Sequence, residues 1–142
     1  MKRRTSELIA ILAMLLTLAS CAPAEPVYTT TGDNWLLGKT WEGNAMLNNA
    51  SEVPVSLPFN DTGLDPIAYP PEKYKVDYLF KDNEIKMHVI HDDESSGIKV
   101  HGDITYTFTR LSENSCNMVA VGTTSSYITM QVTMKGKLTA TK

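Results

Sequence analysis

Cysteine is scarce and positive charge is not in excess in this chain of 142 residues. Its two cysteines, Cys21 and Cys116, allow one disulfide at most, so a hydrophobic core has to supply most of the stability. The 13 Lys and Arg residues are outnumbered by 16 Asp and Glu residues, which gives a formal net charge of -3. Because nucleic-acid binding needs a basic surface, this balance argues against it. The length suits one domain with one core.

The short motifs of common catalytic and cofactor sites are also missing. The chain has no nucleophile elbow, no glycine-rich phosphate loop, no His-Glu-x-x-His sequence and no paired cysteines of a metal or redox site. Ser and Thr are abundant, but along the expected strands they fall on positions that face solvent. We therefore expect a protein that is not an enzyme and that uses no cofactor.

No apolar run is long enough to cross a bilayer, although one run lies near the N-terminus. Residues 8–18 are apolar except for Thr17, and they follow the positive charges of Lys2, Arg3 and Arg4. This run of 11 residues falls short of the roughly 20 that a transmembrane helix needs. A basic segment followed by a short apolar segment and small residues is typical of a secretory signal.

The end of this segment, Leu18-Ala19-Ser20-Cys21, resembles the lipobox of bacterial lipoproteins. The resemblance implies cleavage before Cys21 and acylation of its thiol and new amino group, which would anchor the protein to a membrane. In proteins with this motif an Asp after the cysteine often retains the protein at the inner membrane, so Ala22 favours an outer membrane where the cell has one. The alternatives are an ordinary signal peptide, in which Cys21 is incidental, and a short anchor helix.

Composition divides the chain into three parts. Residues 1–20 are the expected signal peptide, residues 21–34 the lipidated cysteine with a flexible tether of Ala, Pro, Thr and Gly, and residues 35–142 the folded domain. If Cys21 carries lipid, Cys116 has no partner within the chain, and the domain is stable without a disulfide.

Apolar residues alternate with polar ones between Lys73 and Arg110, which predicts three strands with one buried face. Asp82-Asn83 suits a two-residue turn, and residues 92–97 suit a longer loop. A slip by one residue would turn every inward side chain outward, so the pattern restricts the pairing. The expected pairs are Phe80–Ile85, Tyr78–Met87, Val76–Val89 and Tyr74–His91 in the first hairpin, and His91–Ile98, Val89–Val100, Met87–Gly102 and Ile85–Ile104 in the second.

The same alternation predicts strands on both sides of this stretch. Before it, a loop over residues 49–51 would pair Trp41–Phe59, Gly43–Leu57, Ala45–Val55 and Leu47–Val53. Because proline donates no ladder bond, Pro54 and Pro58 indicate an edge strand or an irregular pairing. After it, loops over residues 112–114, 123–125 and 135–137 predict three more hairpins, with the pairs Phe108–Met118, Tyr106–Ala120, Ile104–Gly122, Ala120–Ile128, Met118–Met130, Cys116–Val132, Met134–Leu138 and Val132–Ala140.

Eight antiparallel strands in up-and-down order are expected to close into a barrel, because closure removes both edges and hides the apolar face. The alternative is a β-sandwich. The strand number, the order and a Trp in the first strand, in the run Gly38-Lys39-Thr40-Trp41-Glu42-Gly43, make residues 38–142 similar to the lipocalin-like (calycin) barrels and to small bacterial lipoproteins of that shape. That family has Gly-x-Trp, one residue shorter than here, and an Arg covering the Trp from the last strand, where Lys142 is the nearest substitute.

The expected barrel interior contains tyrosines, methionines and one histidine. Methionine side chains adapt to different ligands, so these residues predict a binding module for a small apolar or amphipathic ligand. The alternative is a barrel filled by its own side chains. The candidate ligand-binding residues are Tyr74, Tyr78, Met87, His91, Tyr106, Met118 and Met130, with Met134 beside them.

Two other functions fit the expected outer surface. Met46, Val119, Val121 and Tyr127 could form an apolar patch that contacts an envelope or host protein. The expected register also places His88 between Asp77 and His101 on one outward row. Two imidazoles and a carboxylate could bind zinc or copper, while the simpler interpretation of Asp77, His88 and His101 is a polar surface row.

Overall fold

Seven antiparallel β-strands form one sheet in residues 27–141, the part of the chain that the computed structural model describes. The expected signal peptide, Cys21 and residues 22–26 of the expected tether lie outside these residues. No helix among the described residues is long and apolar enough to span a bilayer. The strands are β1 (Thr40–Leu47), β2 (Ser51–Pro58), β3 (Tyr74–Lys81), β4 (Glu84–Ser95), β5 (Ile98–Ser112), β6 (Ser115–Ser125) and β7 (Thr129–Thr141).

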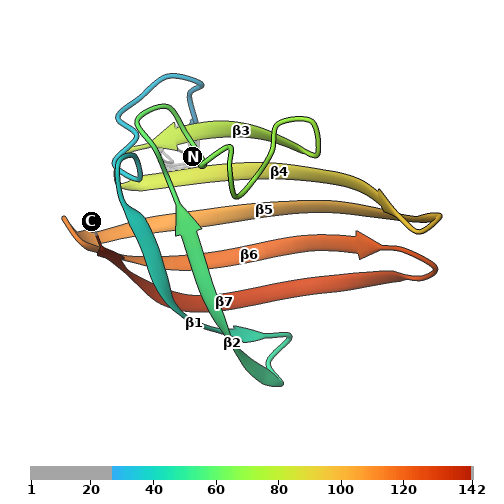
Figure 1. Ribbon diagram of the computed structural model, residues 1–142. Coiled ribbons are helices and arrows are strands. Elements are labelled where there is room, and N and C mark those ends of the chain that lie inside the picture. Colours follow the sequence, from blue (N-terminus) through green and yellow to red (C-terminus); the bar gives the residue numbers. More distant parts are fainter. Residues whose placement is uncertain (1–26, 142) are drawn as a thin grey trace, which may run out of the picture.

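The sheet curls but does not close. Its order is β2-β1-β7-β6-β5-β4-β3, so the first strand pairs with the last one, while β2 and β3, which are consecutive in the chain, form opposite edges. Figure 1 shows β1 and β2 crossing in front of the strands that run from β4 to β7. The prediction of an all-β antiparallel fold is confirmed, whereas the closed eight-stranded barrel is not what the chain forms.

Two hairpins have the register that the alternation predicts. In the β3–β4 hairpin the pairs are Phe80–Ile85, Tyr78–Met87, Val76–Val89 and Tyr74–His91. In the β5–β6 hairpin they are Phe108–Met118, Tyr106–Ala120 and Ile104–Gly122. Both hairpins have short turns of polar residues between regular apolar alternations, so turn and alternation indicate the same pairing.

The β4–β5 register differs from the prediction. Val89 pairs with Ile104 instead of Val100, and Met87 pairs with Tyr106 instead of Gly102, because the strands continue through residues 92–95 to a two-residue turn. Ser96 and Gly97 form that turn with φ of 54° and 80°, the left-handed conformations that a tight hairpin turn requires and that glycine adopts without strain. The predicted loop over residues 92–97 is wrong, since polar strand residues there resemble loop composition.

The last predicted hairpin does not exist, because β7 continues through Lys135-Gly136-Lys137. Met118 pairs with Gly136 instead of Met130, and Cys116 pairs with Leu138. A Cβ at Gly136 would stand 2.4 Å from the Asn44 carbonyl oxygen, so glycine here permits the close approach of β1 and β7. The predicted β1–β2 register is also wrong, since Trp41 pairs with Leu57 instead of Phe59.

The core lies inside the curl, around the buried Trp41. Its indole N–H donates to the Leu36 carbonyl over 3.1 Å, and the Trp35 ring stands edge-on to it at a centroid distance of 5.5 Å. The Lys39 ammonium lies 5.6 Å from the Trp41 ring centroid, so the cation over this Trp comes from the segment before β1. Lys142, expected there, lies outside the described residues. The fully buried side chains with the largest volumes are Trp41, Phe108, Leu36, Ile85, Met87, Met118, Leu138 and Cys116.

Candidate ligand cavity

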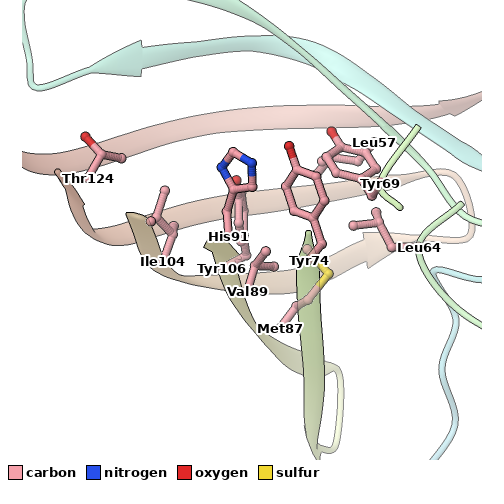
Figure 2. Close-up of a pocket in the computed structure, with 11 residues that line it drawn as sticks. Leu57, Leu64, Tyr69, Tyr74, Met87, Val89, His91, Ile104, Tyr106 and Thr124 are labelled. Atoms are coloured by element: carbon pink, nitrogen blue, oxygen red, sulfur yellow. The ribbon is translucent and has the colours of Figure 1, made fainter. Parts of the chain in front are cut away.

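A cavity of about 220 Å³ lies on the inner face of the sheet, between β3, β4 and β5 on one side and β2 with the following loop on the other. Its floor is aliphatic, and its wall is aromatic (Figure 2). Alternation along β4 and β5 places every second side chain on this inner face. The lining residues are Leu57, Leu64, Tyr69, Tyr74, Met87, Val89, His91, Gly102, Ile104, Tyr106 and Thr124.

Four aromatic rings line the cavity, and three of them, from Tyr69, Tyr74 and His91, contact one another. Tyr74 and His91 are cross-strand partners, and their rings stack at a centroid distance of 4.3 Å with 5° between the planes. Tyr69 meets Tyr74 edge-on, with centroids 5.1 Å apart and planes at 83°. Figure 2 shows the hydroxyls of Tyr69 and Tyr74 and the imidazole of His91 directed to the same side of the cavity. These contacts restrict each ring, so the wall is largely formed before any ligand arrives.

The loop between β2 and β3 contributes Leu64 and Tyr69. The Leu64 N–H donates to the Tyr78 hydroxyl over 3.1 Å, which holds the loop against β3. The Asp65 N–H donates to the Pro58 carbonyl over 2.9 Å, and the Tyr69 N–H donates to the Asp65 carbonyl over 2.8 Å. The loop is therefore a packed segment that covers the cavity, fastened to both edges of the sheet.

The lining carries no carboxylate, guanidinium or ammonium group. Burial raises the pKa of Tyr106 to about 12, with a further contribution from Tyr69 and Tyr74. Burial likewise raises the pKa of Tyr69. Both phenols are therefore protonated and neutral at physiological pH.

The structure brings together four of the seven predicted ligand-binding residues, namely Tyr74, Met87, His91 and Tyr106. The other three lie elsewhere. The Tyr78 hydroxyl accepts from the loop, Met118 is buried in the core, and Met130 is 51% exposed. Met118 and Met130 were expected to face each other, and the true β6–β7 register separates them. Met134 packs against the core.

Sequence reasoning missed most of the remaining wall. Val89 and Ile104 were already assigned to the inner face, and the correct register would have shown that they lie side by side on neighbouring strands. Leu57 was likewise assigned inward on the second strand. Leu64 and Tyr69 come from an irregular loop without alternation, so no sequence pattern indicates that their side chains turn inward.

The three candidate metal ligands do not come together. His88 pairs with Asp77 as predicted, but its other neighbour is Thr105, and its Nε2 lies 2.6 Å from Asp103 Oδ1. His101 pairs with Asp92, with 2.6 Å between Nδ1 and Oδ1. The predicted pairing of His88 with His101 is wrong. Residues 27–141 hold no group of three or more His, Cys, Asp or Glu side chains placed to bind a metal ion.

The four inner-face residues, the stacked wall and the packed loop define the site by geometry alone. No protein-family model, curated protein or solved structure matches this chain.

Proposed function

We propose that the protein is a membrane-anchored lipoprotein of the cell envelope that acts as a non-catalytic binding module for a small apolar ligand. The observation that carries this proposal is the cavity of about 220 Å³ with its aliphatic floor and stacked Tyr74–His91 wall. Binding pockets are concave and mostly apolar, with a few polar groups that orient the ligand. The Tyr74 hydroxyl and the His91 imidazole supply such groups here, and the Tyr69 hydroxyl, which donates to the Ser56 carbonyl, adds an acceptor oxygen.

The test is binding of naphthalene to the full chain, followed by ligand-observed NMR, with native mass spectrometry to detect a co-purified molecule. Gly102 offers a blocking variant, since a Cβ there would stand 3.5 Å from the His91 Cβ, an ordinary contact. Gly102→Leu is expected to fill the cavity and abolish binding while the chain stays folded. Thr109→Leu, on an exposed position of the same strand, is the matched control. A native chain that binds no apolar compound and carries none refutes the proposal.

The anchor is a separate part of the proposal and rests on the run Leu18-Ala19-Ser20-Cys21. Cys21→Ser is expected to abolish incorporation of labelled palmitate in a bacterial host and to release the protein from the membrane fraction. The chain has one other cysteine, Cys116, which is buried. Cys116→Ala is therefore the control, and it should keep the label. Label that survives Cys21→Ser would contradict lipidation at this residue.

A second candidate function, contact with an envelope or host protein, is favoured by the β6–β7 hairpin. No charged residue occurs from Asn114 to Met134, and Tyr127 and Ile128 at the turn are 83% and 68% exposed. Of the patch expected from the sequence, Met46 and Val121 are also exposed. Crosslinking in cells tests this function. Tyr127→Ser with Ile128→Ser should remove a crosslinked partner, whereas Ile67→Ser, at an exposed apolar residue in the β2–β3 loop, should retain it.

A further inference from the structure

We infer that the cavity selects neutral ring compounds of about bicyclic size, and that it discriminates against both anions and cations. This inference rests on the proposed binding function and adds the chemical class of the ligand. It follows from three observations, namely the volume of the cavity, the charge of its lining and surroundings, and the side on which its polar groups stand.

The volume sets the ligand size. A buried apolar cavity of about 150 Å³ is known to hold one benzene ring. At about 220 Å³, the present cavity has room for a second fused ring. The rings of Tyr74 and His91 lie face to face with 5° between their planes, so their stack offers a ligand ring edges and an outer ring face. A planar ligand packs against such a stack with offset stacking or edge contacts, and a branched ligand of equal volume does not.

The charge of the lining excludes ionic ligands. An ion that enters an apolar cavity loses its hydration, and this cost is recovered only if an opposite charge meets it there. No Asp or Glu lines the cavity to meet a cation, and no Lys or Arg lines it to meet an anion.

Carboxylates next to the cavity oppose anions further. Asp92, Asp93 and Glu94 follow His91 directly on β4. The pKa of Asp93 is lowered mainly by a side-chain hydrogen bond from Lys73, with a smaller contribution from His91. This carboxylate is therefore ionised at neutral pH, and it lies near the His91 imidazole. An anion beside the His91 ring would therefore lie near the ionised carboxylate of Asp93.

The polar groups set the orientation of the ligand. The hydroxyls of Tyr69 and Tyr74 and the ring of His91 are directed to the same side, opposite the aliphatic floor of Leu64, Met87 and Val89 (Figure 2). A ring compound with one hydroxyl can place its apolar edge on the floor and exchange a hydrogen bond with this side. The preferred ligand is thus a neutral bicycle with a single polar substituent.

The experiment compares three probes that share the naphthalene ring in calorimetric titrations of the full chain, namely 2-naphthol, 2-naphthoate and 2-naphthylmethylammonium. We expect 2-naphthol to bind about ten-fold more tightly than either ion, or better. If the anion or the cation binds as tightly as 2-naphthol, the inference is wrong and the proposed binding function stands. If no probe and no naphthalene binds, the proposed function itself fails.

Two variants locate the selectivity in this cavity. Gly102→Leu should abolish binding of 2-naphthol, and Thr109→Leu should retain it. Tyr74→Phe should lower the affinity for 2-naphthol about two- to ten-fold more than the affinity for naphthalene, because only 2-naphthol loses a hydrogen bond. Binding of 2-naphthol that persists in Gly102→Leu, or an equal loss for both compounds in Tyr74→Phe, overturns the assignment.

Discussion

The two edges of the sheet, β2 and β3, protect their backbone groups in different ways. Successive residues of an antiparallel strand direct their backbone groups to opposite neighbours. Next to β2 the Phe59 N–H donates to the Lys39 carbonyl. The register therefore directs the backbone N–H and C=O groups of Leu57 and Val55 toward β1, and those of residues 54, 56 and 58 away from the sheet. Two of these three outward positions are Pro54 and Pro58, which have no N–H to donate. The outward carbonyls of Pro58 and Ser56 accept from Asp65 and Tyr69 of the loop.

The β3 edge has no proline. Phe80 exchanges two backbone hydrogen bonds with Thr29, of 2.8 and 2.9 Å, so the N–H and C=O groups of Phe80 point away from β4. By the same alternation the backbone N–H and C=O groups of Val76 and Tyr78 point away from β4 too. Among the described residues these groups form no backbone hydrogen bond. The prolines of β2 thus protect one edge of the sheet against pairing with another strand. At the other edge the N-terminal segment around Thr29 protects only the end of β3.

The largest expected effect comes from placing a proline at a β2 residue whose backbone N–H is directed toward β1. Val55→Pro removes a donor that the register directs to Gly43, and it should lower the free energy of unfolding by about 2 kcal/mol or more. Ser56→Pro removes only an outward donor and should change stability by less than about 0.5 kcal/mol. Denaturant unfolding of both variants measures this contrast. Equal losses would mean that the assignment of inward and outward positions on β2 is wrong.

The next effect concerns the bridge that protects the end of β3. Thr29→Pro removes the donor to the Phe80 carbonyl and should cost about 1 kcal/mol. Hydrogen exchange followed by NMR should show the Phe80 amide exchanging faster in this variant. Thr30→Pro is the control, because the Thr30 N–H takes no part in the bridge. In the native chain the Val76 and Tyr78 amides should already exchange faster than those of Asp77 and Leu79, and the absence of this alternation would contradict an open β3 edge.

A smaller change in stability, with a visible change in association, is expected when β2 loses its prolines. Pro54→Thr with Pro58→Thr restores two outward donors, and the free energy of unfolding should change by less than about 0.5 kcal/mol. The double variant should form dimers or larger species at concentrations where the native chain does not, measured by size exclusion with light scattering. Pro71→Thr, in the loop, should not associate. If the double variant also stays monomeric, the prolines are not what protects this edge.

The smallest expected effect concerns the titration of Tyr28, the residue that precedes Thr29. The Tyr28 hydroxyl donates to a Glu84 carboxylate oxygen, and this bond is the main cause that raises the pKa of Tyr28 from 10.0 to about 12. Because the folded state favours the neutral phenol, this contribution to stability is complete below pH 10 and is lost as the pH rises toward 12. The difference in ultraviolet absorbance between the native chain and Tyr28→Phe isolates this titration. A midpoint near the ordinary value would show that the hydrogen bond does not persist in solution.

The alternation of the sequence predicts which face each side chain occupies, but not the register. The three wrong registers pair Trp41 with Phe59 instead of Leu57, Val89 with Val100 instead of Ile104, and Met118 with Met130 instead of Gly136. The partner is displaced by an even number of residues each time, so inward residues stay inward. A pattern of period two cannot distinguish such displacements, and only the turn can. The turns at Ser96-Gly97 and Ser126-Tyr127-Ile128 were misplaced because polar strand residues next to them resembled loops.

The site was predictable to the same extent. Tyr74 and His91 were found because the β3–β4 register was correct, and Met87 and Tyr106 because their faces were correct. Tyr69 and Leu64 were beyond reach, since the loop packs through backbone bonds such as Asp65 to Pro58 that no periodicity indicates. The predicted strand number was wrong for a related reason, because the assumed turn at Gly136 divided β7 into two strands. The predicted closure was wrong because β2 and β3 do not pair with each other.

The pairing of β1 with β7 has a consequence for the order of folding. The Thr141 hydroxyl donates to the Thr40 carbonyl across 101 residues of chain, so this seam is among the least local contacts that the molecule could make. Non-local strand pairing is slow, because the intervening chain has to be ordered first. While the chain is synthesised from its N-terminus, both sides of the β1–β2 hairpin remain unpaired until the later strands are made. Pro54 and Pro58 protect the free side of β2 during this time, and the free side of β1 is covered only when β7 pairs with it.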